Sequence, residues 1–415
     1  MLRIYSLLVS LIAFVLPVSG WFSKKMHLFV EGRKDIIAEI LKNRIPEDKI
    51  IWIHAASLGE YEQAIPIIQK LNKEHPSYKI WLSFFSPSGY EIKKNTNEVD
   101  YVSYIPLDTR KNAKAFLEAL KPELAIFIKY EIWPNFLYEL ERQNIPRVLI
   151  SALFRPNQTF FKNPKGFRSN ALKLFNKIGV QNLESQELLN QIKYTDAIIS
   201  GDTRYDRVIE QTRRDNGLDF LDEFCSNADL CIVCGSTWPE DEEILLNYIQ
   251  KCPEGIKFVV APHQMQTSRI EKFRRSLLKT SSLWTELETS NLIDSSVLIL
   301  DTVGYLGRAY SYADIAYVGG AVGKTGLHNI LEPATFGIPV LYGRNTKKHP
   351  EAESLEQAGG GIFISNSEEL SMNLDKLVNQ ESFRIQKGKK AQQFIINKAG
   401  ATEKSMQLLR DYLNS

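Results

Sequence analysis

A carboxylate that could act as a general base follows the first apolar run inside the chain. That run ends in His54-Ala-Ala-Ser-Leu-Gly-Glu60. Glu60 could take a proton from a substrate hydroxyl, and Ser57 and Gly59 are small enough to let an acceptor come close. Ser57-Leu-Gly-Glu60 also has the S-x-x-E spacing of a capping box, in which the Glu side chain reaches back to a helix N-terminus. The pattern alone leaves both roles open.

A second carboxylate stands in Lys129-Tyr-Glu-Ile-Trp-Pro-Asn135, directly after another apolar run. Lys129 and Glu131, followed by Trp and Pro at a predicted helix start, are typical of a polar site with an apolar wall. The alternative is a surface ion pair beside a packed Trp, which would contribute little to stability.

Two segments of the second half could bind a phosphate group. In Gly235-Ser-Thr-Trp-Pro-Glu240 the hydroxyls of Ser236 and Thr237 and the backbone amides stand where a helix begins, which is a common place for a phosphate. Ser or Thr before Pro is also an ordinary way to start a helix. His263 ends the next apolar run, where a structural role remains the alternative.

The densest group of chemical residues runs from Gly319 to Pro339. It is not a Walker A motif, because Val318 stands where that motif needs Gly. Its glycines, including Gly320, nevertheless expose backbone amides that could hold an anion near Lys324. Asn329 and Glu332 follow at a spacing of i, i+3, so they share a helix face and could grip ribose hydroxyls and phosphate.

No pattern in the sequence predicts a metal or a cofactor. Asp-x-Asp is absent, and the four cysteines include one C-x-x-C pair, Cys231 and Cys234, inside an apolar run without a second pair. We therefore interpret these cysteines as small buried residues. Lys plus Arg number 51 against 49 for Asp plus Glu, so the charge excludes a polyanion footprint and we expect no nucleic-acid partner.

These candidate residues need elements to position them, and apolar runs alternate with helical patterns along the chain. Alternation of this kind predicts parallel sheets in which ligands bind beyond the carboxyl ends of the strands. The 415 residues are enough for two such domains, which would place a site in the cleft between them. The predicted strands are 49–54, 79–84, 101–105, 124–128, 147–151 and 177–180, then 230–234, 256–260, 297–300, 315–318, 339–341 and 361–364. The predicted helices include 61–72, 111–120, 240–250 and 400–413.

Residues 4–23 form an uncharged apolar stretch with three interpretations. A cleaved signal peptide would use the small residues Val18-Ser-Gly20. A spanning helix needs about 20 apolar residues, which the stretch barely supplies. An interfacial anchor would tolerate Pro17 and place Trp21 and Phe22 among the lipid headgroups.

The charges around this stretch favour a retained anchor. Arg3 precedes it, whereas Lys24, Lys25, Arg33 and Lys34 follow it. Positively charged residues stay on the cytoplasmic side of a membrane, so we expect the rest of the chain to be cytoplasmic.

Six segments in order resemble the Kdo (3-deoxy-manno-octulosonic acid) transferases of lipopolysaccharide synthesis. The resemblance covers nearly the whole chain. The segments are Trp52–Glu60, Tyr130–Asn135, Gly201–Asp206, Gly235–Thr237, Asp301–Gly307 and Gly319–Pro339.

The resemblance implies an inverting glycosyltransferase of GT-B type, with two doubly wound Rossmann-like domains facing a cleft and an N-terminal membrane anchor. The implied donor is CMP-Kdo, and the implied acceptor is the lipid A precursor (lipid IVA). The implied location is the cytoplasmic face of the cell inner membrane. A CMP leaving group carries one phosphate, which agrees with the missing Asp-x-Asp.

The resemblance also implies roles for individual residues. Glu60 would be the catalytic base and Glu131 a second catalytic carboxylate, with Ser57, Gly59 and Lys129 toward the acceptor. The implied donor-binding residues are Ser236, Thr237, His263, Arg269, Val303, Gly304, Gly320, Lys324, Asn329 and Glu332.

Two positions depart from the family pattern. His263 stands where the family often has Arg, so Arg269 or Lys324 would have to replace that donor contact. Val303 stands where many members have Met, which leaves a backbone contact to the base.

We therefore predict four segments: an anchor (1–30), an acceptor domain (31–195), a donor domain (196–395) and a C-terminal helix (396–415) that could cross back to the acceptor domain. The alternatives are another GT-B sugar-nucleotide transferase or epimerase, and a membrane-attached sugar-nucleotide-binding protein without turnover.

Overall fold

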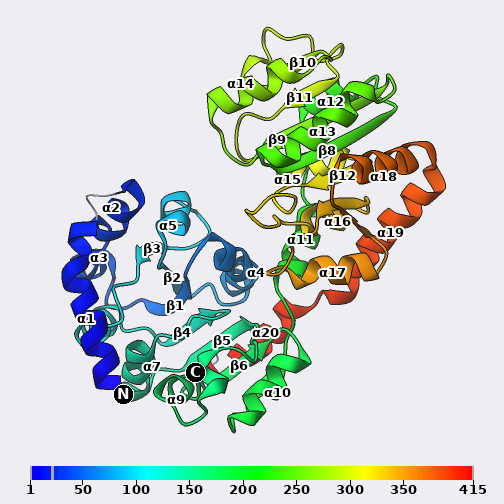
Figure 1. Cartoon of the computed structure of the whole chain (residues 1–415). Helices are drawn as coiled ribbons and strands as arrows, with labels where there is room; N and C mark the ends of the chain where they lie inside the picture. The colour runs from blue at the N-terminus through cyan, green and yellow to red at the C-terminus, as the bar shows by residue number, and fades with distance from the viewer. Residues whose placement is uncertain (1, 20–22, 414–415) are drawn as a thin grey trace. The chain divides into compact units, whose positions relative to one another are not determined.

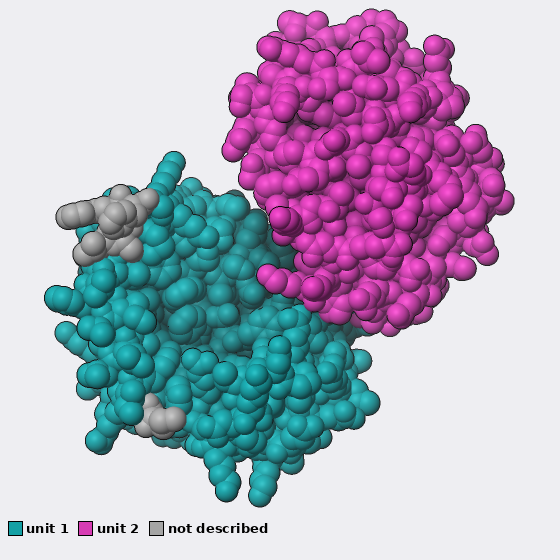
Figure 2. Space-filling model, viewed as in Figure 1, with its two compact units in different colours: residues 1–207, 399–415 teal, residues 208–398 magenta. Residues whose placement is uncertain are grey.

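A computed structural model describes residues 2–19 and 23–413 of the chain. These residues form two compact units, coloured separately in Figure 2. Unit 1 comprises residues 1–207 and 399–415, and unit 2 comprises residues 208–398.

Unit 1 is built on a seven-stranded sheet of order β3-β2-β1-β4-β5-β6-β7, in which all neighbouring strands are parallel. Figure 1 shows its helices on both faces. The strands are β1 (Lys49–Ala55), β2 (Tyr78–Phe84), β3 (Tyr101–Tyr104), β4 (Leu124–Ile128), β5 (Arg147–Ala152), β6 (Lys177–Val180) and β7 (Ala197–Ile199).

Both faces of this sheet are buried, which explains why its strands are continuous apolar runs. Successive side chains of a strand point to opposite faces, so Ile50 and Trp52 of β1 join one core and Ile51 and Ile53 join the other. Helices α3, α6, α7 and α9 supply the first core, and α4 and α20 supply the second.

The helices of unit 1 include the last helix of the chain. Asp206 fastens α20 to the unit, because its carboxylate accepts hydrogen bonds from the amides of Gly400 (2.6 Å) and Thr402 (2.7 Å). The helices are α1 (Leu2–Ser19), α2 (Lys24–Glu31), α3 (Ile36–Asn43), α4 (Leu58–Glu74), α5 (Pro87–Lys93), α6 (Arg110–Leu120), α7 (Pro134–Arg142), α8 (Thr159–Lys162), α9 (Phe167–Leu172), α10 (Leu183–Gln191) and α20 (Ala401–Leu413). Helix α11 (Arg204–Thr212) carries the chain from unit 1 into unit 2.

Unit 2 repeats this plan with a sheet of order β10-β11-β9-β8-β12-β13-β14, again parallel throughout. The strands are β8 (Leu230–Thr237), β9 (Ile256–Pro262), β10 (Ser281–Leu283), β11 (Val297–Ile299), β12 (Ile315–Val318), β13 (Val340–Gly343) and β14 (Gly361–Ile364). The helices are α12 (Asp219–Cys225), α13 (Pro239–Lys251), α14 (Thr267–Ser276), η1 (Trp284–Glu286), α15 (Leu306–Ala309), η2 (Tyr310–Tyr312), α16 (Leu331–Thr335), α17 (Pro350–Gln357), α18 (Ser367–Asn379) and α19 (Glu381–Lys398).

The structure confirms two doubly wound α/β domains and every predicted strand, with shifts of a few residues at the ends. Two short edge strands, β7 and β10, were not predicted, since three residues carry too little alternation to be recognised. Because β7 pairs with β6, the first sheet continues past residue 195, the predicted end of the acceptor domain.

The predicted anchor falls largely on α1. Among the described residues, no helix is both long enough and apolar enough to cross a membrane. Two polar side chains of α1 bond to the rest of unit 1: Tyr5 Oη donates to Asp108 (2.8 Å) and Ser6 Oγ donates to Asn135 (2.7 Å). Gly20 of the proposed cleavage site, with Trp21 and Phe22, lies outside the described residues.

The cysteines are thiols within the fold. Cys231 and Cys234 are buried in β8, Cys252 is buried and Cys225 is half-buried. Within 2–19 and 23–413, no three His, Cys, Asp or Glu side chains gather as a metal site would require.

Candidate active site

Each sheet has one point at which its strand order reverses, and ligands of doubly wound folds bind at such points. In unit 1 the reversal lies between β1 and β4, and in unit 2 between β8 and β12. Glu60 and Glu131 follow β1 and β4, whereas Ser236 lies at the end of β8 and the glycine-rich segment follows β12. The predicted acceptor and donor residues therefore each centre on a ligand-binding edge of a sheet.

Glu60 lies in the first turn of α4 and is partly exposed. The Ser57 hydroxyl donates a hydrogen bond to its carboxylate. Ser57 is the N-cap residue, but its side chain makes no capping hydrogen bond among the described residues. The side chains of the S-x-x-E motif are therefore bonded to each other, and the Glu60 carboxylate stays at the strand-end surface. The neighbouring Gly59 is exposed, which leaves room beside the carboxylate.

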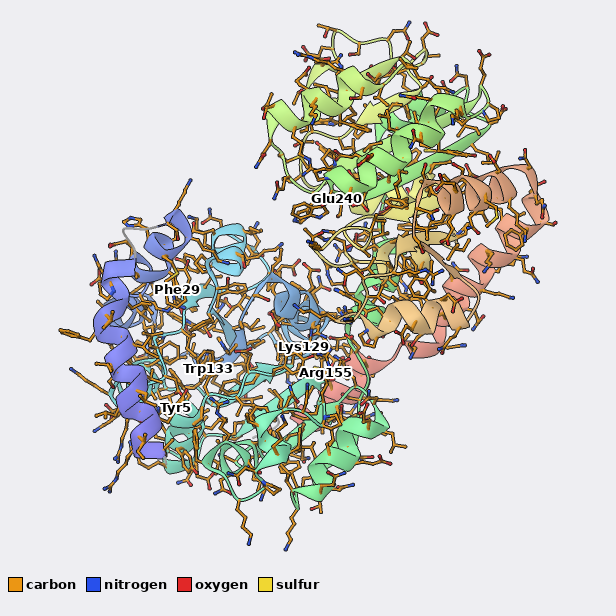
Figure 3. All side chains as sticks on the ribbon, viewed as in Figure 1. Tyr5, Phe29, Lys129, Trp133, Arg155 and Glu240 are labelled. Carbon is orange, nitrogen blue, oxygen red and sulfur yellow. The ribbon has the colours of Figure 1, made fainter. Side chains whose placement is uncertain are left out.

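Glu131 is held by two rings. The Trp133 indole N–H donates to Glu131 Oε2 (2.8 Å), and His54 Nε2 lies 3.3 Å from the same oxygen, without the alignment of a hydrogen bond. The side chain of Glu131 is 14% exposed and that of His54 is fully buried. Trp133, labelled in Figure 3, packs on Phe85 with ring centroids 4.9 Å apart. The carboxylate therefore has a fixed orientation beside an aromatic wall.

Behind Glu131 a chain of hydrogen bonds leads into the core. Trp52 Nε1 donates to Ser83 Oγ (2.8 Å), and Ser83 Oγ lies 2.9 Å from His54 Nδ1. The indole N–H can only donate, whereas the Ser83 hydroxyl can either donate a hydrogen bond to Nδ1 of His54 or accept one from it. Nε2 is the ring nitrogen of His54 that faces Glu131.

Cations and a phenol surround this edge of unit 1. The Lys129 ammonium lies 5.2 Å from the centroid of the Tyr130 ring. Lys129 and Arg155, both labelled in Figure 3, come from the segments after β4 and β5. Burial raises the pKa of Tyr130, and the charge of Arg155 lowers that pKa while the charge of Glu60 raises it. Glu60, Tyr130 and Arg155 therefore share one electrostatic environment.

The Gly201–Asp206 segment ties the same edge together. Asp202 accepts from Gln63 Nε2 of α4 (3.0 Å) and from Arg204 Nη2 (2.7 Å), while Thr203 Oγ1 donates to the carbonyl of Gln63 (2.6 Å). This motif therefore holds the helix that carries Glu60.

In unit 2 a buried carboxylate organises the glycine-rich segment. Asp241 accepts from the amides of Trp238 (2.9 Å) and Gly320 (2.8 Å) and from the Tyr317 hydroxyl (2.6 Å). Gly320 has φ +95, and a Cβ there would lie 2.2 Å from the Gly326 carbonyl oxygen, so only glycine fits the turn. Glu240, labelled in Figure 3, lies against Gly323 of the same segment.

A cluster of three rings lies at these strand ends. His263 stacks on Trp238 with centroids 4.9 Å apart, His263 and His328 centroids lie 4.2 Å apart, and Trp238 Nε1 donates to His328 Nε2 (2.9 Å). Burial lowers the pKa of His328 to about 4 and also lowers the pKa of His263. The cluster is therefore a neutral aromatic surface at pH 7, and His263 offers stacking where a charged contact was expected of the family.

Arg269 and Thr237 are engaged within the fold. Arg269 Nη2 donates to Glu242 (2.9 Å) and to the Thr237 carbonyl (3.1 Å), and the Thr237 hydroxyl donates to Glu242 (3.0 Å). Thr237 is fully buried and the Arg269 side chain is 14% exposed. Their side chains hold the strand-end loop. Of the two candidates to replace the family Arg at position 263, Arg269 and Lys324, only Lys324 is exposed.

The remaining donor residues lie on two neighbouring segments. Asn329 lies just before α16, so the prediction that it shares a helix face with Glu332 is wrong. The two side chains are nevertheless in contact, because Asn329 Nδ2 donates to Glu332 (3.0 Å). Glu332 approaches the turn after β11, because a Cβ on Gly307 would lie 4.0 Å from its Oε2. In that turn Val303 is 77% exposed, and Gly304 has φ +103 with open space beside it. Ser236 also takes a positive φ of +54, at the end of β8.

Sequence reasoning missed the residues that hold the site. His54 and Ser83 are inside apolar strands, and Asp241 and Glu242 are two of several acidic residues at the start of one helix. A single His in an otherwise apolar strand was the signal that could have identified His54 as a residue supporting the site. No pattern distinguishes Asp241 from Glu243, because only the fold shows which carboxylate is buried.

Comparisons with known proteins agree with the family resemblance of the sequence motifs. Residues 32–207 match the family model described as 3-deoxy-D-manno-octulosonic-acid transferase (kdotransferase). The chain is 28% identical over 353 residues to 3-deoxy-D-manno-octulosonic acid transferase of Aquifex aeolicus, covering 82% of this chain and 91% of that protein. It is 27% identical over 385 residues to the Haemophilus influenzae protein of the same name, covering 89% and 88%.

The fold has a solved counterpart. UDP-GlcNAc 2-epimerase from Neisseria meningitidis, bound to UDP-GlcNAc, superimposes with a TM-score of 0.62 at 16% identity, covering 88% of this chain and 100% of that one. This likeness concerns the fold alone. Residues 32–207 thus match the Kdo transferase family model, and the chain over most of its length is similar to the 3-deoxy-D-manno-octulosonic acid transferases of these two organisms.

Proposed function

We propose that the protein is a Kdo transferase of lipopolysaccharide biosynthesis that moves Kdo from CMP-Kdo to the lipid A precursor with inversion. The observation that carries this proposal is Glu60, a partly exposed carboxylate at the reversal point of the Kdo transferase domain. The homology to curated Kdo transferases supports the transferred sugar. The donor nucleotide and the acceptor lipid belong to the proposal.

In this mechanism Glu60 takes the proton from an acceptor hydroxyl. The acceptor oxygen attacks the anomeric carbon of Kdo, a new C–O bond forms, and the bond to the phosphate oxygen breaks. CMP leaves with that electron pair, and attack from the opposite side inverts the anomeric centre. Glu131 has a fixed orientation and would bind acceptor hydroxyls or carry part of the proton transfer.

Unit 2 would bind CMP largely through its backbone. Exposed amides of the Gly319–Gly326 segment suit the single phosphate, and Asn329 with Glu332 suits the ribose hydroxyls. The neutral rings of Trp238, His263 and His328 suit stacking.

The test is incubation of the purified full chain with CMP-Kdo and lipid A precursor, with the products identified by mass. We expect the precursor to gain Kdo and CMP to be released. Competition by CMP but not by UDP would separate this function from that of a UDP-sugar transferase or epimerase. Donor binding without any product would favour a binding protein instead.

We further propose that the transfer step needs no divalent metal, since one phosphate leaves with CMP. Activity with preformed CMP-Kdo should survive EDTA. Complete loss that magnesium restores would refute this part of the mechanism.

We also propose that α1 keeps the enzyme on the cytoplasmic face of the inner membrane as a retained interfacial anchor. Large apolar side chains of α1 face solvent, among them Leu7 (71% exposed) and Phe14 (82% exposed). Burying such side chains among lipids is favourable by roughly 1.5–3 kcal/mol each. Sequencing the mature N-terminus tests retention, and a start near residue 21 would contradict it.

A further inference from the structure

A cavity of about 750 Å³ lies between α1 and the helices α6 and α7 of unit 1. It is separate from the residues assigned above to the acceptor and the donor. Its lining combines cationic side chains, including Arg3, Arg110 and Lys111, with the apolar side chains of Leu2 and Leu7. A cavity of this size and composition suits an anion that also carries apolar groups.

The cations of this cavity lack acidic partners. Among residues 2–19 and 23–413, no carboxylate lies within ion-pair distance of Arg3, Arg110 or Lys111. Glu139 also lines the cavity, but Arg142 Nη2 (2.5 Å) and Gln143 Nε2 (2.7 Å) already donate to its carboxylate. Arg3, Arg110 and Lys111 therefore have no ion-pair partner within the described part of the chain.

The helix that carries two of these cations increases the positive potential. Arg110 and Lys111 occupy the first turn of α6, which has no acidic residue. The N-terminus of a helix carries partial positive charge, so cations are unfavourable there and an anion is favourable. A bound anion would turn this unfavourable arrangement into a favourable one.

Helix α1 brings an apolar surface to the same cavity and holds it in place. Tyr5 and Ser6 fasten α1 to Asp108 and Asn135, as described above. Tyr5 is labelled in Figure 3, on the part of α1 that lines the cavity. Leu7 lines the cavity and continues into the exposed apolar side chains Leu8 (54%) and Leu11 (60%). An anionic group in the cavity would thus have hydrocarbon beside it.

From this juxtaposition we propose that the cavity binds the phosphate headgroup of an anionic membrane phospholipid, whose acyl chains lie along α1. The proposal rests on the membrane attachment of α1 proposed above. Free phosphate shares the anionic chemistry, but it would leave the apolar part of the lining and the adjoining face of α1 unused.

The test uses the full chain and vesicles of phosphatidylcholine, either alone or mixed with the anionic lipid phosphatidylglycerol, whose negative surface potential attracts cationic side chains. The double variant Arg110→Gln/Lys111→Gln removes two cations of the cavity. The matched control, Lys73→Gln/Lys404→Gln, removes two exposed cations from α4 and α20 on the opposite face of the sheet. Both variants change the net charge equally.

We expect the cavity variant to bind anionic vesicles about 10-fold more weakly, since each cation near such a surface adds several-fold to binding. Its binding to neutral vesicles should be unchanged, and the control variant should bind anionic vesicles like the wild type. Equal losses in both variants, or no loss in either, would overturn the proposal.

Two further measurements are needed. The first distinguishes a lipid phosphate from free phosphate, and the second separates binding at the cavity from the proposed transferase activity. Inorganic phosphate should release the wild type from anionic vesicles no better than chloride of equal ionic strength, and a larger effect of phosphate would assign the cavity to free phosphate and overturn the lipid assignment. Sugar transfer to detergent-dispersed acceptor should be unchanged in the cavity variant. Vesicle binding needs no turnover, so it can be read even if the proposed transferase activity is absent.

Discussion

Each sheet has a carboxylate near the point where its strand order reverses, and the two carboxylates differ in their exposure to solvent. In unit 1 Glu60 is partly exposed, and its carboxylate accepts a hydrogen bond from Ser57. In unit 2 Asp241 is fully buried and accepts three hydrogen bonds, two from the amides of Trp238 and Gly320 and one from the Tyr317 hydroxyl of β12. At the same edge of the sheet, unit 1 thus offers a carboxylate to a ligand, whereas unit 2 offers backbone groups of its glycine-rich segment.

This difference separates two tasks that a transferase must perform. A carboxylate that is to move a proton must reach the substrate, as Glu60 does. A carboxylate that is to shape a binding loop is most effective when it is buried and fully bonded, as Asp241 is. Substitutions at the two edges should therefore affect different measured quantities.

The largest effect is expected for Glu60→Gln. Gln preserves the size of the side chain and can still accept from Ser57, but it cannot accept a proton. We expect the variant to fold, to bind CMP-Kdo and to lose about 10²–10⁴-fold in kcat, the usual scale of general base catalysis. Steady-state kinetics with thermal unfolding measure both properties.

The matched control is Glu74→Gln at the other end of α4, where the carboxylate pairs with Lys70 (3.2 Å) on the surface. It should keep the wild-type kcat, because exposed ion pairs contribute little. A stable Glu60→Gln variant with nearly normal kcat would remove the base from the mechanism and leave the fold assignment intact.

The counterpart in unit 2 is Asp241→Asn, which should change stability as well as binding. The amide replaces one acceptor oxygen by a donor, so at least one of the Trp238, Gly320 and Tyr317 donors loses its partner. An unpaired buried donor costs about 1–3 kcal/mol. We expect a lower Tm together with weaker CMP binding, because the turn at Gly320 loosens. Wild-type values of both would show that the buried carboxylate does not hold the loop.

Glu332→Ala should affect binding alone. Glu332 is half-buried, and its carboxylate accepts a hydrogen bond from the Asn329 side chain. We expect CMP affinity to fall about 10-fold, the scale of one hydrogen bond to a charged group. The Tm should stay close to that of the wild type, measured by calorimetry. Unchanged affinity would reduce Glu332 to a charge near a helix start.

The sequence predicted the framework of both edges but only part of their chemistry. Long apolar runs identified the strands, and their alternation with helical patterns indicated parallel sheets. The positions of Glu60, Glu131 and the glycine-rich segment directly after strands could be predicted because ligand sites of such sheets lie there. The edge strands β7 and β10, with three residues each, gave no periodic signal.

What the sequence could not predict is which polar side chains the fold would use for its own support. Arg269 and Thr237 were candidates for donor contacts, yet both bond to the buried Glu242. Such pairing depends on contacts between residues far apart in the chain. For the same reason the stacking of His263 on Trp238 could not be read from their positions 25 residues apart.

The smallest expected effect concerns pH and the ring cluster of unit 2. Burial lowers the pKa of His328 to about 4, below the usual value near 6.5 that it regains on unfolding. Between these values the unfolded chain binds more protons than the folded one. The contribution of His328 to the free energy of unfolding should therefore be fully present above about pH 6.5 and decrease as the pH approaches 4.

His328→Gln keeps an acceptor for the Trp238 indole but does not titrate. Between pH 7 and pH 4.5 the free energy of unfolding should fall in both proteins. Because the ring is partly exposed, we expect the fall to be smaller in the variant by only about 1 kcal/mol. Calorimetry of the full chain at the two pH values measures the difference, with His75→Gln in unit 1 as the control. An equal pH dependence in the wild type and His328→Gln would mean that the cluster is already open to water, and the contrast between a dry, pre-formed edge in unit 2 and an exposed, ionisable edge in unit 1 would no longer hold.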